Sequence, residues 1–321
     1  MRLEQPLETV HYPVLLEQTL EYLAPRGKYE LMVDATMGEG GHSYAFLSRY
    51  SGVSLIGIDA DSEIQAIAKE RLAEFGERVQ FFKGWAQEFF ANWPVVTGQP
   101  DTILADLGIS RFHYEKSGRG FSFSGNEKLD MRLDTSSGVS AAEILAQRPE
   151  GEIADILYRN SGERYSRSIA KAIVEERKRG GIITAAALSD LVSRVVPPSY
   201  QHGPIHSATR TFMALRIAVN GELLKLPELL EGALGILKPG GRLGIISFHS
   251  LEDRIVKNFF KMKNKDCSCP PEKPSCVCGG RKSGYILTPK GVTAGEEELI
   301  SNPPSRSARL RVAEKLQEKF V

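Results

Sequence analysis

A glycine-rich segment near the start of the chain has the composition of a nucleotide-binding turn. It reads DATMGEGGH over residues 34–42, and its glycines are Gly38, Gly40 and Gly41. Glycine lets the backbone turn tightly and approach a ligand with no Cβ in the way. The spacing departs from the dinucleotide fingerprint G-x-G-x-x-G, so the segment alone also fits an ordinary tight turn.

Asp59 strengthens this interpretation, because it closes the next apolar run along the chain. A carboxylate at that place can accept hydrogen bonds from both hydroxyls of an adenosine ribose. The alternative is a helix cap, since aspartate before a helix is common. Together, the glycine-rich segment and Asp59 predict a site for an adenosine-containing cofactor.

Two further segments place polar side chains directly after apolar runs. Asp106 begins the run Asp-Leu-Gly-Ile-Ser, where its carboxylate could contact the cofactor, accept a proton from a substrate amine or cap the next turn. In the run SFHSLEDR, residues 247–254, we expect Ser250 to be a helix N-cap, with Asp253 approximating a capping box. Capping leaves His249 unexplained, and this side chain could be a general base or an RNA contact.

The four cysteines of the chain form a compact cluster. They are Cys267, Cys269, Cys276 and Cys278. Four thiolates can hold Zn²⁺ tetrahedrally, but the C-x-C spacing departs from the usual C-x-x-C knuckle. We expect a reduced loop with no metal, and a zinc site is the alternative.

The elements around these residues alternate between strand-like and helix-like segments. The expected strands span residues 31–33, 54–58, 78–82, 102–107, 242–248 and 308–312, with helices at 42–50, 62–75, 228–237 and 251–262. This alternation predicts an α/β fold, with a parallel sheet covered by helices on both faces. Ligands of such sheets bind at the carboxyl ends of the strands, where the glycine-rich segment, Asp59 and Asp106 would meet.

The alternation is interrupted in the middle of the chain. Residues 111–139 are rich in glycine, serine and charge, and helical segments follow at 140–147, 152–158, 166–179 and 184–196. A further long helix is expected at 208–224. We therefore predict one discontinuous α/β domain, residues 1–110 and 208–321, interrupted by a helical insert at 111–207.

Composition limits the function classes. The 321 residues are 41% hydrophobic and 25% charged, with a net charge of +1, which is typical of a globular protein and gives no support to nucleic-acid binding. No apolar run could span a membrane and the first ten residues are unlike a secretory signal, so we expect a cytoplasmic protein with no membrane partner. Two basic segments, 159–179 and 254–290, fit either a local polyanion contact or a solvated surface.

Several of these runs resemble the ribosomal RNA small-subunit methyltransferase H family. They are DATMGEGGHS (34–43), DLGIS (106–110), RGFSF (119–123), LDMRLD (129–134), ATRTF (208–212), IISFHSLEDRIV (245–256) and NPPSRSARLR (302–311). The resemblance extends from about His11 to Lys315. It implies a class I Rossmann-like methyltransferase domain with an inserted helical domain that recognises the substrate.

The resemblance also implies an activity and a set of contacts. The activity is N4-methylation of a cytidine in the decoding region of 16S ribosomal RNA, with S-adenosylmethionine as cofactor and the RNA or the 30S particle as partner; a homodimer is possible. The implied cofactor contacts are Gly38, Gly40, Gly41, His42, Asp59, Trp85, Asp106 and His113. His113 stands where the family has glutamine, and Ser207 replaces a proline before ATRTF.

The amine chemistry leaves the proton acceptor open. The chain lacks the Asp/Asn-Pro-Pro-aromatic motif of related amino-methyltransferases, so no motif identifies the acceptor. We expect Asp106 to be the catalytic acceptor, with Ser110, His249 or backbone carbonyls as alternatives. Two other functions compete with this hypothesis. One is an NAD-dependent oxidoreductase, against which the glycine spacing argues, and the other is a non-catalytic RNA-binding assembly factor.

Overall fold

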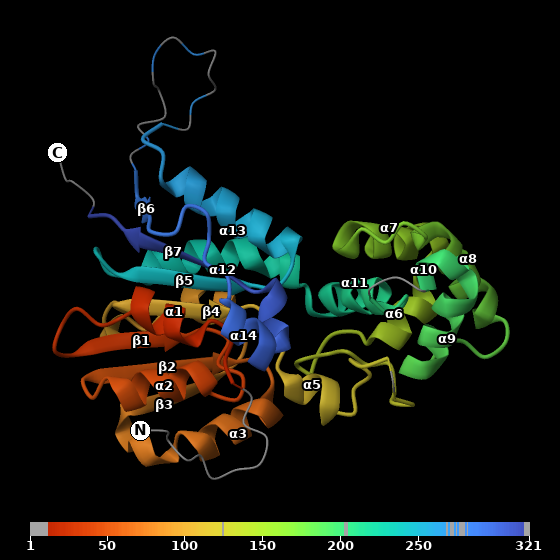
Figure 1. Ribbon diagram of the computed structural model, residues 1–321, viewed down its shortest axis with the longest axis horizontal. Coiled ribbons are helices and arrows are strands. Elements are labelled where there is room, and N and C mark those ends of the chain that lie inside the picture. The colour runs from red at the N-terminus through yellow and green to blue at the C-terminus, as the bar shows by residue number, and fades with distance from the viewer. Residues whose placement is uncertain are drawn as a thin grey trace. The chain divides into compact units, whose positions relative to one another are not determined.

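The computed structural model describes residues 12–317, apart from 124, 202–204, 268, 270–272, 274, 276–279 and 281. The chain divides into two compact units (Figure 1), which we call the sheet unit, residues 1–108 with 225–321, and the helical unit, residues 109–224. The first boundary lies close to the predicted one. The second corrects the predicted return at residue 208, because the helix that begins at Thr209 packs within the helical unit.

The sheet unit is built on one seven-stranded sheet in the order β3-β2-β1-β4-β5-β7-β6. The first five strands in this order are parallel, and β7 runs antiparallel to both of its neighbours. The order reverses between β1 and β4, which is where doubly wound sheets open a crevice for ligands. The strands are β1 (Glu30–Asp34), β2 (Val53–Asp59), β3 (Val79–Lys83), β4 (Thr102–Asp106), β5 (Arg242–Ser247), β6 (Gly284–Ile286) and β7 (Arg309–Lys315).

Helices cover both faces of this sheet, because successive residues of a strand point to opposite sides. Val33 faces a core shared with α4, α12 and α13, whereas Met32 faces a core shared with α1, α2 and α3. Three short helices, α1, α4 and α14, and the strand β6 were not predicted. The helices are α1 (Leu16–Tyr22), α2 (Gly41–Arg49), α3 (Ser62–Arg71), α4 (Ala86–Ala91), α12 (Glu222–Ile236), α13 (Ser250–Lys263) and α14 (Glu296–Ser301).

The helical unit has a separate hydrophobic core. A capping box begins its second helix, since Ser140 accepts from the amide of Glu143 and the Glu143 carboxylate accepts from the amide of Ser140. Its helices are α5 (Arg111–Glu115), α6 (Ala141–Gln147), α7 (Glu150–Ser161), α8 (Ser166–Arg177), α9 (Ala185–Val195), α10 (Pro198–Gln201) and α11 (Thr209–Asn220).

The motif LDMRLD is held inside the helical unit by buried polar side chains. Arg119 donates to the carbonyls of Arg132 and Leu133 at 3.1 Å each. Asn220, on α11, donates to the carbonyl of Met131 at 2.8 Å and accepts from the amide of Leu133 at 2.9 Å. These bonds tie α11 to the irregular segment before α6, and Phe212, Ala214 and Leu215 of α11 lie in the core of the same unit.

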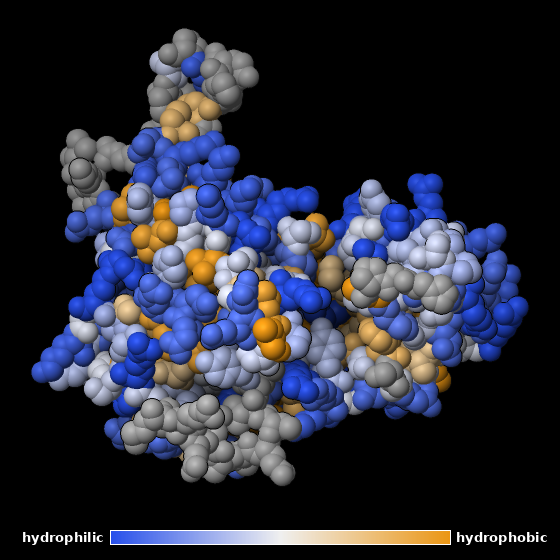
Figure 2. Space-filling model, in the orientation of Figure 1, coloured by the Kyte–Doolittle hydropathy of each residue, from blue (hydrophilic) through white to orange (hydrophobic). Residues whose placement is uncertain are grey.

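The surface of the described residues is mixed. Figure 2 shows mainly hydrophilic side chains on the visible face, with small apolar patches among them. Among the described residues, no helix is long and apolar enough to cross a membrane.

Candidate functional site

The glycine-rich loop after β1 and the end of β2 are joined by a carboxylate. Asp59 accepts the amide of Gly38 through Oδ2 and the amide of Asp61 through Oδ1, at 2.8 Å each. Gly38 and Gly40 have φ values of 54° and 76°, which few residues with a Cβ adopt. A Cβ at Gly41 would also lie 2.6 Å from Pro13. The predicted glycines and Asp59 therefore form one rigid turn at the carboxyl edge of the sheet.

Two further acids, Asp34 and Asp106, lie at the ends of the neighbouring strands β1 and β4. Asp34 is 2% exposed and accepts the hydroxyl of Ser43 at 2.7 Å. The pKa of Asp34 is raised to about 6, mainly by burial. The pKa of Asp106 is raised to about 7, first by burial and then by the negative charges of Asp34 and Glu252, against the lowering effect of a hydrogen bond from the backbone of Gly108. Two carboxyl groups at one sheet edge therefore have pKa values close to neutral pH. Such a pair favours a ligand that brings positive charge or a proton.

Asp106 offers an open acceptor at this edge. Its amide donates to the hydroxyl of Thr36 at 2.7 Å, which fixes the end of β4 against the glycine-rich loop. Its Oδ1 atom is buried and has no hydrogen-bond partner among the described residues. A buried acceptor without a donor is costly, so this atom marks the place where a ligand N–H would be stabilising.

His42 lies beside the same carboxylate. Its Nε2 is 3.1 Å from the carbonyl oxygen of Val14, which can only accept, so Nε2 carries a hydrogen. Its Nδ1 is 3.8 Å from Oδ2 of Asp106. The predicted residues His42 and Asp106 are thus brought together, and His42 contacts Asp106 on the oxygen opposite to the open acceptor.

Trp85 follows β3 and neighbours Asp59 through the backbone, since the amide of Gly84 donates to the carbonyl of Asp59 at 2.9 Å. The Nζ atom of Lys225 lies 3.2 Å from the centroid of the indole. One face of the ring is therefore occupied by an ammonium group. An adenine at Trp85, as the resemblance implies, would need another face or edge of the indole.

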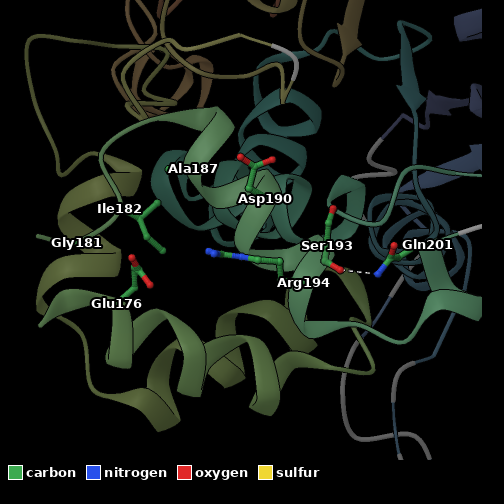
Figure 3. A pocket seen from close by; sticks show the side chains of 8 residues that line it. All are labelled: Glu176, Gly181, Ile182, Ala187, Asp190, Ser193, Arg194 and Gln201. Atoms are coloured by element: carbon green, nitrogen blue, oxygen red, sulfur yellow. Dashed lines mark hydrogen bonds between the residues drawn. The ribbon is translucent and has the colours of Figure 1, made fainter. Parts of the chain in front are cut away.

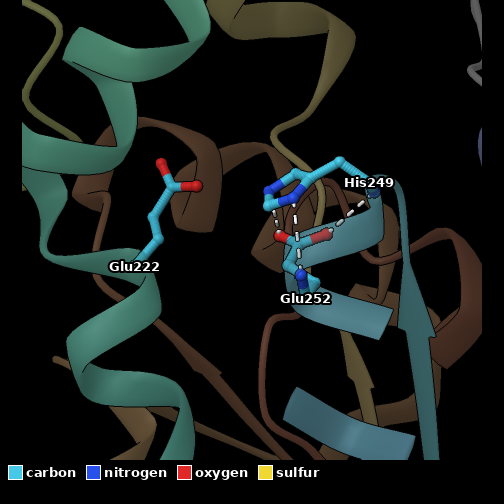
Figure 4. Close-up of side chains that lie close together, drawn as sticks. All are labelled: Glu222, His249 and Glu252. Carbon is cyan, nitrogen blue, oxygen red and sulfur yellow. Dashed lines mark hydrogen bonds and ion pairs between the residues drawn. The ribbon is translucent and has the colours of Figure 1, made fainter. Parts of the chain in front are cut away.

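The N-cap of α13, the helix that follows β5, is His249 (Figure 4). The predicted N-cap, Ser250, is instead the first residue of the helix. The amide of Glu252 donates to Nδ1 of His249 at 3.4 Å, and Oε2 of Glu252 accepts the amides of His249 at 3.3 Å and Phe248 at 2.8 Å. Asp253 is not part of this box, because it forms a two-pronged ion pair with Arg311 of β7. His249 therefore has a structural role that sequence reasoning missed.

Other predicted residues lie elsewhere. His113 is on α5 in the helical unit, with its ring 5.3 Å from that of Phe121, and it is 4% exposed. The amide of Cys269 donates to Sγ of Cys267 at 3.4 Å, while Cys276 and Cys278 lie outside the described residues. The reduced loop with no metal therefore stays a prediction, and zinc stays its alternative.

A pocket of about 660 Å³ lies in the helical unit and contains none of the predicted site residues (Figure 3). Its charged side chains are Glu176, Asp190 and Arg194. Across its rim, the side-chain amide of Gln201 donates to the carbonyl of Ser193 at 2.6 Å. The mixed charges of this lining favour no single class of ligand.

Sequence reasoning also missed Ser43 and Lys225. Ser43 stands at the end of the glycine-rich run, so its contact with Asp34 was open to prediction from its place in that run. Lys225 is distant in sequence from Trp85, and no local pattern signalled that contact.

The comparisons with known proteins agree over nearly the whole chain. The MraW methylase family matches residues 8–316. A protein of Treponema denticola named ribosomal RNA small subunit methyltransferase H is 55% identical over 310 residues, which cover 97% of this chain and 98% of that protein. Proteins of the same name from Heliobacterium mobile and Treponema pallidum are 44% and 39% identical, and the alignments cover 97% and 95% of this chain and 100% and 92% of those proteins. The predicted fold class, a class I Rossmann-like methyltransferase fold, is confirmed, and the chain belongs to the MraW methylase family.

Proposed function

We propose that this protein transfers a methyl group from S-adenosylmethionine to the exocyclic N4 of a cytidine in the decoding region of 16S ribosomal RNA. Family membership supports RNA methylation, because relatives across its length are named for that activity. The observation that carries the amine assignment is the buried Oδ1 atom of Asp106, an acceptor with no donor among the described residues.

The residues at the sheet edge fit an adenosine-containing cation. Asp59 is oriented by two backbone amides, and a carboxylate oxygen that accepts one amide can also accept a ribose hydroxyl. The positive φ values of Gly38 and Gly40 allow the tight turn that places the loop backbone at this edge. The acids at the ends of β1 and β4 provide negative potential for the positive charges of S-adenosylmethionine. The cofactor, when bound, supplies an electrophilic methyl group on a sulfonium sulfur.

The chain's own contribution to the chemistry is to orient and deprotonate the amine. The N4 lone pair of cytosine is delocalised into the ring, so the amino group is a poor nucleophile. Asp106 accepts a hydrogen bond from one N–H and takes that proton once the new N–C bond places a positive charge on N4. A carboxyl group with a pKa of about 7 is matched to this transfer near neutral pH.

Nucleoside mass spectrometry tests this function. Purified protein and S-adenosylmethionine carrying a labelled methyl group are incubated with 30S particles and, separately, with naked 16S RNA that lacks the modification. We expect label on the cytosine exocyclic nitrogen with wild-type protein and none with Asp106→Asn. Label on uridine, on a ring carbon of cytosine or on protein would overturn the proposal, and the two substrates show whether the particle is required.

A further inference from the structure

The helical unit carries an exposed ring stack whose chemistry the proposed function does not use. The rings of Phe123 and His206 are parallel within 10°, with centroids 4.3 Å apart. Phe123 also packs edge-on against Phe212 of the core, with centroids 5.8 Å apart, whereas His206 is exposed. One face of the imidazole is therefore backed by the core and its other side is accessible.

The orientation of His206 is fixed by its own backbone neighbourhood. Its Nδ1 accepts the amide of Ala208 at 3.2 Å, and its carbonyl accepts the amide of Thr209 at 3.0 Å. These bonds hold the ring at the start of α11. A ring that is already ordered loses little conformational freedom when a planar ligand stacks on it.

A second aromatic side chain lies at the same end of α11 and is surrounded by cations. Tyr200 accepts a hydrogen bond from Arg210 at 2.6 Å, and its hydroxyl donates to the carboxylate of Glu163 at 2.8 Å. The guanidinium carbons of Arg164 and Arg210 lie 5.4 Å and 5.6 Å from the centroid of the Tyr200 ring. Tyr165 contacts the same ring edge-on at 5.0 Å.

The first turn of α11 connects these two rings, because Ala208 bonds to His206 and Arg210 bonds to Tyr200. We call the four side chains His206, Tyr200, Arg164 and Arg210 the aromatic–arginine surface. Neither arginine has a carboxylate partner in the part of the chain that the structure describes. Glu163 is linked to Arg210 only through the Tyr200 hydroxyl. Two cations that make no direct ion pair and an exposed ring form the combination that binds single-stranded nucleic acid through phosphates and stacked bases.

From these contacts we propose that the aromatic–arginine surface binds an unpaired segment of the RNA substrate, with a base stacked on His206 and phosphates at Arg164 and Arg210. The occupant we favour over a protein is RNA, because the arginines make no direct ion pair among the described residues and the ring is backed and ordered for stacking. This inference rests on the proposed function in that it assumes an RNA substrate, and it assigns a contact outside the sheet unit. The glutamate beneath the tyrosine, Glu163, is fully buried and holds Tyr200 in place.

Binding of a fluorescein-labelled single-stranded oligoribonucleotide to the full chain, measured by anisotropy at several salt concentrations, tests the surface. His206→Asn keeps an acceptor for the amide of Ala208 and removes the ring, whereas His206→Phe keeps the ring and removes the acceptor. We expect roughly tenfold weaker binding for His206→Asn with an unchanged salt slope, and near wild-type binding for His206→Phe. Arg164→Ala should instead flatten the salt slope by about 0.7, the share of one phosphate contact.

A base analogue and two control variants make the test specific. An oligonucleotide that contains 2-aminopurine should lose fluorescence on binding to wild-type protein and to His206→Phe, and lose less with His206→Asn. Tyr158 is an exposed aromatic residue of α7, 62% accessible, and Arg159 is ion-paired with Asp155. Replacing either Tyr158 or Arg159 by alanine should leave RNA binding unchanged.

The outcomes separate this inference from the proposed function. Wild-type RNA affinity in His206→Asn, or equal losses in His206→Asn and the Tyr158 control, would overturn the RNA surface while methyl transfer to cytosine N4 could still hold. Loss of RNA binding as expected, without label on cytosine, would keep the surface and overturn the proposed function. Tight competition by an acidic polypeptide together with wild-type RNA binding in all variants would show a protein site and also overturn the inference.

Discussion

The amide of Gly38 donates to Oδ2 of Asp59 at 2.8 Å, so the glycine-rich loop after β1 is fastened to the end of β2. This bond uses the permissive backbone of one residue to orient the carboxylate of the other. A carboxylate oxygen can accept more than one hydrogen bond, so this bond does not prevent Asp59 from accepting one from a ligand. The loop and the acid are thus one structural unit, and a change at either should alter both.

Asp59→Ala should weaken binding of S-adenosylmethionine by at least tenfold. The charge-assisted hydrogen bonds to the ribose hydroxyls that we expect of Asp59 are worth about 1.5–3 kcal/mol. The variant should also have a lower melting temperature than the wild type, because the amides of Gly38 and Asp61 lose their acceptor. Isothermal titration calorimetry and thermal melting measure the two effects.

A neighbouring residue gives the matched control for Asp59. Asp61 caps α3 by accepting the amide of Glu63 at 2.9 Å. Asp61→Ala should lower the free energy of unfolding by about 1 kcal/mol through the lost cap, with cofactor affinity unchanged. Equal cofactor affinity in the wild type and Asp59→Ala would remove Asp59 from the binding site.

Asp106→Asn should make the protein more stable than the wild type, increasingly so between pH 4 and pH 7. The folded pKa of Asp106, about 7, is above its value of about 3.9 in the unfolded chain, so the folded state binds the proton more tightly. As the pH rises, ionisation in the unfolded chain lowers the stability of the wild type, and this loss is complete above about pH 7. The full difference is at most about 4 kcal/mol, or several degrees in melting temperature.

Thermal melts of both proteins at pH 5 and pH 8 check this expectation, and kinetics at pH 8 separate the roles of Asp106. If Asp106 accepts the amine proton, Asp106→Asn loses kcat and still binds RNA. If it contacts only the cofactor, the KM for S-adenosylmethionine rises and kcat persists. Identical melting differences at the two pH values would show that the carboxyl group is not held in its neutral form.

Binding of S-adenosylmethionine should release a proton at pH 6 and almost none at pH 8.5. The free protein holds Asp106 mostly protonated at pH 6, since its pKa is about 7. The positive charges of the cofactor favour the ionised carboxylate, so affinity should rise with pH until about 7 and then level off. Calorimetry in buffers of different ionisation enthalpy measures the released proton directly.

Asp106→Asn is the control for this proton release, because the amide cannot ionise. Its binding enthalpy should be the same in every buffer once corrected for any other group that titrates. A wild-type binding enthalpy that is independent of buffer at pH 6 would show that the cofactor does not contact Asp106. The remaining role of Asp106 would then be to accept the proton of the RNA amine.

The sequence predicted the sheet edge well because strand ends are marked locally. Apolar runs ending in Asp34, Asp59 and Asp106 became β1, β2 and β4, and parallel pairing then brings these ends together. The boundary at residue 208 was wrong for a physical reason. An apolar helix face does not say which core it joins: Phe212, Ala214 and Leu215 of α11 pack into the core of the helical unit, and Asn220 bonds to Met131 and Leu133 there.

The cap of α13 was predicted wrongly for a related reason. Ser250 is the better capping residue by type, and Asp253 stands at the capping-box spacing. Arg311 of β7, 58 residues further along the chain, takes the carboxylate of Asp253 instead. His249 and Glu252 then form the box one position earlier, which no local pattern could have shown.

Replacing the cap tests this structural role of His249. His249→Asn keeps a favoured capping residue, so the free energy of unfolding should stay close to that of the wild type, whereas His249→Ala should lower it by about 1 kcal/mol. Glu252→Gln should cost more, because its buried carboxylate accepts the amides of Phe248 and His249. Full methyl transfer in His249→Asn would exclude His249 as a general base; a loss of kcat at unchanged stability would restore that role.

Two exposed basic faces, one in each unit, give the last prediction. On α8, Arg167 and Lys171 are one turn apart and exposed, and on α13 Arg254, Lys257 and Lys261 form a similar row. These five cations have no ion-pair partner among the described residues. Counter-ions released by phosphate contacts make RNA affinity fall steeply with salt, so reversing either row to glutamate should weaken binding and flatten the salt slope.

The two rows differ in what each reversal can show. Cofactor affinity should be unchanged in both variants, which separates RNA binding from the site at the sheet edge. Lys263, at the end of α13, is paired with Glu231 at 2.8 Å, so Lys263→Gln is the matched control and should leave the salt slope unaltered. A salt slope that changes only for the α8 row would confine the RNA contacts to the helical unit. A salt slope that changes for neither row would show that both basic segments are solvated surface and do not contact RNA. Measurement of the slope for each variant with the same single-stranded RNA, over one range of salt concentrations, decides between these outcomes, because each phosphate contact contributes about 0.7 to it.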